Sequence, residues 1–232
     1  MKAAGESGIL CDKATHDLIG DALIFQELPA IRVKGKEDLR QDVVMQQIFY
    51  LVNNLLQKNA ETRKRKLAIR TYKIVPLSPR AGILEWVDNT RTFADFLIGT
   101  RSAPYNCAHV RYNPKDKLSF ECRSLLGSCK EPQKLQTYRA ICATFKPVFH
   151  HYFLEYFPSP AQWFLKRVAY TRSVAVNSMV GYIVGLGDRH IQNLLIDNTT
   201  AEVIHIDLGV AFEQGKALAI PEIVPFRLTR DM

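Results

Sequence analysis

The hydrophobic pattern near the start of the chain changes from a two-residue period to a helical one. Ala30–Lys34 alternates apolar and polar residues, as a half-buried strand does. From Leu39 to Lys58, apolar residues recur at three- and four-residue steps, which is the pattern of a helix face about five turns long. Asp38 precedes that run and is a suitable N-cap. The pattern therefore predicts a strand followed by a long amphipathic helix.

Two further strands are predicted before the pattern changes again at Val87. Leu67–Val75 is rich in apolar and β-branched residues, and Ile83–Val87 is a short apolar run. Prolines and a glycine between the two runs favour a turn. Residues 1–29 carry little pattern. A small β-rich lobe is therefore predicted over residues 30–87.

The pattern of residues 88–232 is mainly helical. Gln133–Phe149 and Pro160–Gly185 are the clearest helix candidates, and the second ends at a glycine, as many helices do. Asn106–Leu126 is irregular and supports no assignment. Two short strands joined by a turn are predicted at Leu194–Asp197 and Glu202–Ile206. This order of elements predicts an α+β fold with a small β-rich lobe and a larger helical lobe.

Composition places the chain among globular proteins. Of its 232 residues, 47% are hydrophobic and 23% are charged, which excludes a disordered or collagen-like chain. No apolar run approaches the roughly 20 residues that a membrane-spanning helix needs. The N-terminus lacks the apolar core of a signal peptide, so a cytosolic or nuclear location is expected. Five cysteines without a CxxC pair predict reduced structural thiols.

The net charge of +8 suits a protein that binds a polyphosphate nucleotide. The sharpest basic run is Arg63–Lys66, which we interpret as a solvated loop between the long helix and the next strand. The alternatives are a nuclear localisation signal and a contact with nucleic acid.

Polar residues near the C-terminal end have the spacing of a phosphoryl-transfer site. Asp188 and Asn193 lie five positions apart, and Asp207-Leu208-Gly209 begins fourteen positions after Asn193. Phosphoryl transfer needs oxygens that hold Mg²⁺ against the phosphates and one polar group beside the attacking hydroxyl. Protein-kinase catalytic loops use the same interval, although the order here is Asp-Arg-His and not His-Arg-Asp. The alternative is a purely structural role, in which the aspartates cap turns and His190 is a buried residue with its hydrogen bonds made inside the core. We expect His205 to be a hydrogen-bonded structural histidine.

Several stretches resemble the phosphatidylinositol-3-kinase-like kinases. Gly185–Asn193 and His205–Gly215 resemble the catalytic loop and the metal motif of that family. Val33–Asp42 resembles its ATP-lysine segment, and Thr71–Ser78 resembles the strand behind the adenine. The resemblance extends from Val33 to Asp231, and it is narrowed to the DNA-damage kinases of the family by Glu61–Leu67, Tyr170–Ala175 and Val224–Arg230. It implies a bilobal protein-kinase-like fold, with ATP and Mg²⁺ or Mn²⁺ as cofactors.

The resemblance implies a role for each reacting residue. Asp188 would hold the substrate hydroxyl as base, and His190 would steady the γ-phosphate or its transition state. Asn193 and Asp207 would ligate the metal ions. Lys34 would contact the ATP phosphates as a point charge. We therefore expect Lys34 and Asp207 to face each other across a cleft between the lobes.

The resemblance also implies a nucleotide pocket between the lobes. Glu37 and Asp42 would orient Lys34. The remaining pocket residues would be Tyr72 on the inner wall, Trp86 as an apolar wall, Leu195 and Ile206 as the floor, and the backbone groups of Glu85 and Val87 facing adenine. Without the family, Tyr72 and Trp86 are interpreted as ordinary core residues, and Lys34 as a surface lysine.

Two departures from the family pattern concern the ends of the chain. Residues 1–29 do not resemble the family's phosphate-covering loop. The chain stops at Met232, just after the activation segment and before the helices that complete the family's catalytic lobe. We therefore expect a fragment with both ends incomplete: a divergent segment at 1–29, a partial small lobe at 30–87 and a shortened large lobe at 88–232.

The function that we favour is that of a serine/threonine protein kinase. The alternatives are a phosphoinositide lipid kinase and a catalytically incomplete fragment. The activation segment, Gly209–Pro225, holds two glutamates and one lysine and so has a net charge of −1, whereas an inositol phosphate favours a basic cluster. The family implies phosphorylation of Ser or Thr before Gln, in nuclear DNA-damage signalling and telomere maintenance. It also implies protein substrates, DNA-damage sensor proteins as partners and homodimerisation, without direct membrane contact and with indirect nucleic-acid contact at most.

Overall fold

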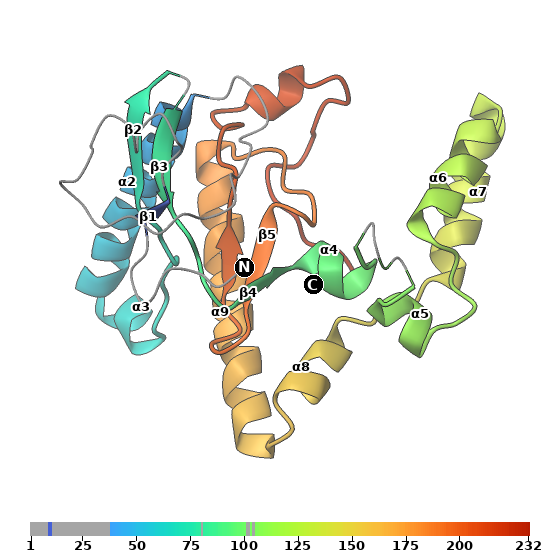
Figure 1. The fold of residues 1–232 in the computed structure, drawn as a ribbon, viewed down its shortest axis with the longest axis horizontal. Coiled ribbons are helices and arrows are strands. Elements are labelled where there is room, and N and C mark those ends of the chain that lie inside the picture. The colour runs from blue at the N-terminus through green and yellow to red at the C-terminus, as the bar shows by residue number, and fades with distance from the viewer. Residues whose placement is uncertain (1–8, 11–37, 80, 101–102, 104) are drawn as a thin grey trace.

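The computed structural model describes residues 9–10, 38–79, 81–100, 103 and 105–232. The predicted strand at 30–34 lies outside these residues, and so do Lys34 and Glu37. In the described part, helices combine with two small antiparallel sheets (Figure 1). The predicted α+β fold class is therefore confirmed.

Helix α2 (Leu39–Lys58) has the predicted bounds. The Asp38 carboxylate accepts a hydrogen bond from the Arg40 N–H at 3.1 Å, and this bond satisfies one of the otherwise unpaired N–H groups of the first turn. One face of the helix is buried, and it includes polar as well as apolar residues: Asp42, Met45, Gln46 and Phe49. The two polar residues on this face contribute to the site described below.

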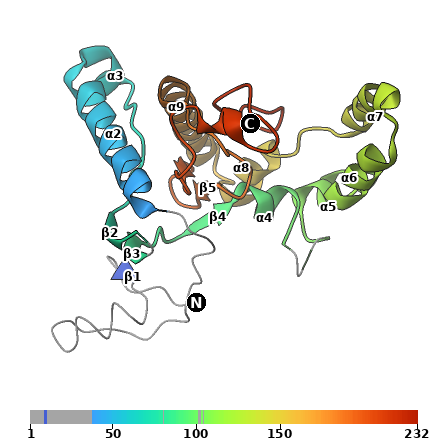
Figure 2. The same cartoon turned by 90° about the horizontal axis from the view of Figure 1, so that it is seen from above.

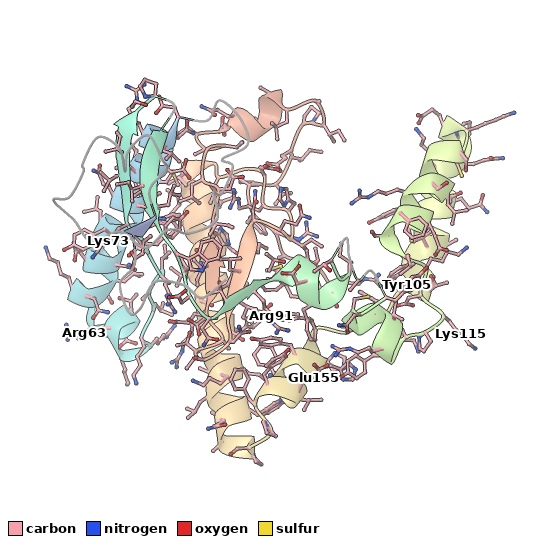
Figure 3. All side chains as sticks on the ribbon, in the orientation of Figure 1. Arg63, Lys73, Arg91, Tyr105, Lys115 and Glu155 are labelled. Atoms are coloured by element: carbon pink, nitrogen blue, oxygen red, sulfur yellow. The ribbon has the colours of Figure 1, made fainter. Side chains whose placement is uncertain are left out.

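The basic run Arg63–Lys66 is exposed, as predicted, but part of it is helical. Asn59 Oδ1 accepts hydrogen bonds from the backbone N–H groups of Glu61 and Thr62 at 3.0 and 3.2 Å, and so starts helix α3 (Ala60–Lys64). Figure 3 shows Arg63 on the outer side of the small lobe. The run is therefore a solvated surface beside α2.

The small lobe contains a three-stranded sheet in the order β1 (Ile9–Leu10), β3 (Ala81–Glu85), β2 (Ile74–Ser78). The prediction of a strand over Leu67–Val75 is wrong for residues 67–73. Asn53 of α2 bonds to this stretch instead: its Nδ2 donates to the Ile69 carbonyl and its Oδ1 accepts from the Ile69 N–H, both at 2.8 Å. A side-chain amide thus takes the place of a neighbouring strand. Strand β3 also ends at Glu85 and not at Val87.

The large lobe contains a second antiparallel sheet in the order β4 (Thr90–Thr92), β5 (Leu194–Asp197), β6 (Val203–His205). Strands β5 and β6 confirm the predicted pair. Strand β4 was not predicted, because three residues are too short for a period to be recognised. Its pairing with β5 brings the connection between the lobes next to the predicted catalytic segment.

Helices form most of the large lobe. They are α4 (Phe93–Leu97), α5 (Ala108–Tyr112), α6 (Ser119–Ser128), α7 (Glu131–Thr144), α8 (His150–Tyr156), α9 (Pro160–Val184) and the 3₁₀ helix η2 (Gln214–Ala217). Helix α9 confirms the long helix predicted over Pro160–Gly185, with Gly185 as its C-cap. The helix predicted over Gln133–Phe149 ends early, because Pro147 disfavours helical backbone before it. Helices α6 and α7 extend away from the rest of the lobe (Figures 1 and 2).

Two hydrophobic cores hold these elements together. The first lies in the large lobe and is rich in aromatic rings; Phe93 and Phe149, for example, stack with ring centroids 4.6 Å apart. The second joins the lobes, because Met45 and Phe49 of α2 share it with Val176 and Val180 of α9. The small-lobe helix is therefore packed directly on the large lobe.

The predictions about cysteines and about membrane-spanning helices can be compared with the described residues. Their four cysteines, which are Cys107, Cys122, Cys129 and Cys142, are free thiols, as predicted. Within the same residues, none of the helices combines the length and the apolar character needed to cross a bilayer.

Candidate active site

The predicted catalytic loop begins where α9 ends. Gly185 has the left-handed backbone φ of 61° at the helix C-terminus. The Gly185 and Leu186 N–H groups both donate to the Gly181 carbonyl. A Cβ atom on Gly185 would lie only 2.6 Å from the backbone nitrogen of Glu213. Glycine is therefore required both by the conformation and by the close approach of the activation segment.

Asp188, His190 and Asn193 lie together on this loop. Asp188 Oδ2 is 3.8 Å from His190 Nε2. The Gln192 N–H donates to His190 Nδ1 at 3.2 Å, so a neutral His190 carries its proton on Nε2, toward Asp188. Asn193 Nδ2 donates to the Asp188 carbonyl at 3.1 Å. The loop thus holds the predicted base, the predicted phosphate-binding histidine and one predicted metal ligand in a fixed arrangement.

Arg189 ties this loop to the predicted metal motif. Its side chain is buried, and it donates to three carbonyls: Nε to Gly187 at 2.7 Å, one Nη to Ile206 at 2.7 Å and the other Nη to Asp207. Burial lowers the pKa of Arg189, and the carboxylates of Asp207 and Asp188 act in the opposite direction. The role of Arg189 was not predicted, because its three acceptors are backbone carbonyls and leave no side-chain pattern in the sequence.

Asp42 reaches the metal motif from the other lobe. Its Oδ1 accepts a hydrogen bond from the Leu208 N–H at 2.8 Å. Burial raises the pKa of Asp42, the bond to Leu208 lowers it, and the charge of Asp207 raises it. A Cβ atom on Gly209 would lie 3.9 Å from a carboxylate oxygen of each aspartate. Asp42 therefore lies beside Asp207, while its predicted partner Lys34 is outside the described residues.

Tyr72 lies in the same electrostatic environment. It is buried, and its N–H donates to Gln46 Oε1 at 3.2 Å. Burial raises the pKa of the Tyr72 hydroxyl, and the charge of Asp42 raises it further. The backbone of Tyr72 is therefore fixed by α2. Gln46 is a second residue of the site that was not predicted from the sequence pattern.

The connection between the lobes holds the predicted adenine-facing residues. The Glu85 N–H donates to the Lys73 carbonyl at 2.8 Å and is therefore engaged within the small lobe. The Val87 carbonyl accepts from Thr90 Oγ1 at 2.9 Å. With the Glu85 N–H engaged, the Val87 N–H is the donor that remains of the two predicted adenine-facing residues. Trp86 between them is 47% exposed.

The predicted floor residues lie on the β5–β6 pair. Leu195 pairs with Ile204, and the Ile206 N–H donates to the Asn193 carbonyl at 3.1 Å. Because side chains alternate along a strand, Leu195 and Ile206 lie on the same face as Asn193. That face is opposite to the one that Leu194 adds to the core.

Asn193 and Asp207 fit a metal ion that is shared with a nucleotide. Because Asn193 Nδ2 is bonded to Asp188, its Oδ1 is the atom left for a ligand. Asp207 is an exposed carboxylate with a left-handed φ of 56°. Mg²⁺ in nucleotide sites takes one or two protein carboxylates, with phosphates and water completing its shell. Among the described residues, no cluster of three His, Cys, Asp or Glu side chains could hold a metal alone.

His205 differs from its prediction as a hydrogen-bonded residue. Its side chain is buried, and within the described part of the chain Nδ1 has no hydrogen-bond partner. Burial lowers the pKa of His205 to about 3, and the charge of Arg189 acts in the same direction. His205 is therefore a neutral imidazole behind the site.

The matching family model is that of phosphatidylinositol 3- and 4-kinases, and it covers residues 30–232. The serine/threonine-protein kinase ATM of Arabidopsis thaliana is 55% identical over 226 residues, which are 97% of this chain and 6% of that protein. The serine-protein kinase ATM of Sus scrofa is 53% identical over 203 residues, 86% of this chain and 6% of that protein. A solved structure described as the complete CtTel1 dimer with C2 symmetry has a TM-score of 0.77 and 47% identity, over 85% of this chain and 7% of that one. The chain thus spans a small part of the relatives that it matches.

Proposed function

Because this chain belongs to the phosphatidylinositol 3- and 4-kinase family, we propose that it is the catalytic core of an ATP-dependent serine/threonine protein kinase of the ATM type. The observation that carries the proposal is the convergence of Asp42, Asp188, Asn193 and Asp207 around the buried Arg189. These residues come from both lobes, as a site for a nucleotide between lobes requires. The similarity to named serine/threonine kinases supports the same assignment.

The environment of each proposed site residue is compatible with a specific chemical role. Asp188 would orient the substrate hydroxyl and accept its proton late, since the transition state is loose and positioning dominates. His190, with its proton on Nε2, would donate a hydrogen bond to the transferred phosphoryl group. Asn193 and Asp207 would hold the metal. When bound, ATP and Mg²⁺ or Mn²⁺ supply the phosphoryl group and the positive charge that offsets its oxygens.

The nucleotide would lie against residues of both lobes. Leu195 and Ile206 would form an apolar floor, Tyr72 the inner wall, and Trp86 a wall beside the connection. The Val87 N–H would meet the adenine. As the family implies, Lys34 would contact the phosphates and Glu37 would orient Lys34.

A protein substrate is favoured over a lipid by the activation segment. Its net charge of −1 provides no basic cluster for an inositol phosphate. Two of its apolar side chains are almost fully exposed, Ile220 at 86% and Ile223 at 92%. Such residues can pack on an extended peptide. From its similarity to ATM, we also propose Ser or Thr before Gln as acceptor, a nuclear location, sensor-protein partners, and roles in DNA-damage signalling and telomere maintenance.

Homodimerisation is part of the same proposal. The similar CtTel1 structure is described as a dimer. The present chain covers 7% of that structure's chain, and we propose homodimerisation for the complete protein without assigning the contact to these residues.

The deciding experiment compares two acceptors side by side. The complete protein is assayed on a Ser-Gln peptide and on phosphatidylinositol vesicles, each with ATP and Mg²⁺ or Mn²⁺. We expect transfer to the peptide. Transfer to lipid alone would replace the protein-kinase proposal with the lipid-kinase alternative. A nucleotide titration of the 232-residue chain alone tests the third alternative, because a catalytically incomplete fragment that lacks the site would not bind Mg-ATP.

A further inference from the structure

We propose that Glu222 is a positioning residue that holds the catalytic loop and the activation segment in a single register. The inference rests on the proposed kinase function, which assigns the base role to Asp188. Both carboxylate oxygens of Glu222 accept the Asp188 N–H, at 2.9 and 3.0 Å. The Glu222 N–H donates to the Gly215 carbonyl at 3.0 Å. Glu222 therefore connects the backbone of the base to the segment on which a substrate would lie.

Two glycines leave the space that the Glu222 carboxylate occupies. A Cβ atom on Gly187 would lie 2.5 Å from Glu222 Oε2, and a Cβ atom on Gly215 would lie 2.5 Å from the same oxygen. Gly187 is fixed in turn by its N–H, which donates to the Val210 carbonyl at 2.8 Å. The carboxylate thus fills a slot between the catalytic loop and the activation segment, with no room for a side chain on either wall.

The Asp188 backbone requires such support. Its φ of 56° lies in the left-handed region, which is less favourable for a non-glycine residue than right-handed or extended backbone, even though aspartate adopts it more readily than most. A hydrogen bond from an N–H to a carboxylate is stronger than one between neutral groups. The buried guanidinium of Arg189 also attracts the Glu222 carboxylate. Glu222 therefore acts on the proposed base through its backbone and does not touch the reacting atoms.

The main test is Glu222→Ala in the complete protein. We expect kcat for peptide phosphorylation to fall about a hundredfold, because small displacements of a catalytic group have effects of this size. The KM for ATP should stay within about twofold, since Glu222 is not among the residues assigned to the nucleotide. Glu222→Gln keeps an oxygen that can accept the Asp188 N–H, and it should restore most of the lost kcat.

The control is Glu213→Gln, which removes the same charge from the same segment. Glu213 is exposed, and its carboxylate pairs with Lys216 at 2.8 Å and not with the catalytic loop. Its kcat should equal that of the unchanged protein. A loss in Glu213→Gln as large as in Glu222→Ala would show that the net charge of the segment matters, and would overturn the proposal.

A second variant reaches the same slot without changing Glu222. In Gly215→Ala, the methyl group would meet Glu222 Oε2, the mobile end of a side chain, so the fold should survive while the carboxylate is displaced. We expect the same loss of kcat. Hydrogen exchange at the Asp188 amide gives a readout without catalysis, and it should accelerate in Glu222→Ala and Gly215→Ala but not in Glu213→Gln.

The outcomes separate this inference from the proposed function. If the unchanged protein transfers phosphate to no peptide, the kinase proposal fails, and the exchange rates still test the contact. If it is active and both slot variants keep full kcat and slow exchange at Asp188, the positioning role of Glu222 is wrong.

Discussion

At the scale of single residues, the site depends on two aspartates with unusual backbone conformations. Asp188 and Asp207 both have a φ of 56°. Arg189 donates hydrogen bonds to carbonyls on both segments, those of Gly187 and Asp207 among them. One buried guanidinium therefore holds the segments of the predicted base, Asp188, and of the predicted metal ligand, Asp207. A substitution at either aspartate tests its chemical role only if the new residue keeps the same backbone conformation.

The first prediction concerns the metal ligand. Asp207→Asn removes a carboxylate, and asparagine tolerates the left-handed conformation well. We expect Mg-ATP-dependent turnover to fall at least about a hundredfold, because the metal loses its only charged protein ligand in the proposal. Titration of activity against Mg²⁺ measures the effect. The matched control is Asp95→Asn, an exposed aspartate on α4, which should leave turnover unchanged. Retained turnover in Asp207→Asn would show that the metal site is misassigned.

The second prediction concerns the base. Asp188→Asn should lower kcat by about 10² to 10⁴, the usual contribution of a general base. The dissociation constant of ATP should remain within about twofold, because the proposed role places Asp188 at the acceptor hydroxyl and not at the adenine. Steady-state kinetics and a nucleotide titration on the same sample separate the two quantities. A weakened ATP affinity with an unchanged kcat would contradict the assigned role.

Residue spacing predicted residues that the structure brings together, such as Asp188 and Asn193, but it did not predict the contacts that hold them. The interval from Asp188 to Asn193 indicates a catalytic loop because protein-kinase loops place the base and the metal-binding asparagine at the same interval. No such rule identifies Arg189, whose three acceptors are backbone carbonyls and leave no side-chain pattern. The same reason applies to Gln46, which bonds to the Tyr72 N–H.

At the scale of elements, a histidine between two aspartates joins three parts of the large lobe. His109 Nδ1 on α5 lies 2.8 Å from Asp116, and its Nε2 lies 3.7 Å from Asp231. Asp231 Oδ1 also accepts the N–H groups of Val148 and Phe149, at 2.7 and 3.2 Å, just before α8. The cluster therefore fastens the C-terminal segment to α5 and to the start of α8.

The third prediction is the pH dependence of this cluster. Burial lowers the pKa of His109, but hydrogen bonds to Asp231 and Asp116 outweigh it and raise the pKa above its usual 6.5. Stabilisation by charged His109 is thus complete below pH 6.5 and is lost as pH rises through the raised pKa. Burial raises the pKa of Asp231, but its bonds to His109 and to Val148 outweigh it and lower the pKa below 3.8. The contribution of Asp231 is therefore complete above pH 3.8 and is lost only in stronger acid.

The test compares His109→Gln with the unchanged chain by urea unfolding. We expect the variant to lose about 1.5 to 3 kcal/mol near pH 6, the usual contribution of a hydrogen bond to a charged group, and less near pH 8.5. The control is His150→Gln, because His150 is exposed at the start of α8. An equal loss at both pH values would show that His109 contributes by packing and not by charge.

Elements were predictable where they are long or strongly periodic. Helices α2 and α9 and the β5–β6 pair occur where the pattern places them. Strand β4 and helices α4, α5 and α8 have seven residues or fewer, which is too short for a helical period or an alternation to be distinct. The stretch 67–73 has a strand-like composition, but its partner is the Asn53 side chain, and this contact is not visible in local sequence.

At the scale of the whole molecule, the second core makes the two lobes one folded unit. Phe49 of α2 is 2% exposed and packs in the same cluster as Val180 of α9 and Leu208 of the metal motif. Composition and pattern predicted two lobes, but they could not predict this packing, because it depends on which faces meet in three dimensions. The orientation of Lys34 toward Asp207 stays a prediction, since Lys34 lies outside the described residues.

The fourth prediction measures the packing between the lobes. Phe49→Ala should lower the free energy of unfolding by about 3 to 5 kcal/mol, because it removes a large buried ring and leaves a cavity. Leu55→Ala on the same helix is the control, since Leu55 is 58% exposed and should cost less than about 0.5 kcal/mol. Urea unfolding followed by circular dichroism measures both. Equal losses in the two variants would mean that α2 does not pack on the large lobe as described.

The carboxylates around the buried guanidinium would also determine which form of the nucleotide the proposed site can accept. Four carboxylates act on the charge of Arg189, those of Asp42, Asp188, Asp207 and Glu222. Even with Lys34 added from the family resemblance, negative charges outnumber positive ones, so a metal-free triphosphate entering this region would be repelled. In the proposed kinase, the site would therefore favour the metal complex of the nucleotide, and excess free ATP would inhibit chiefly by withdrawing the metal from solution and only weakly by occupying the pocket.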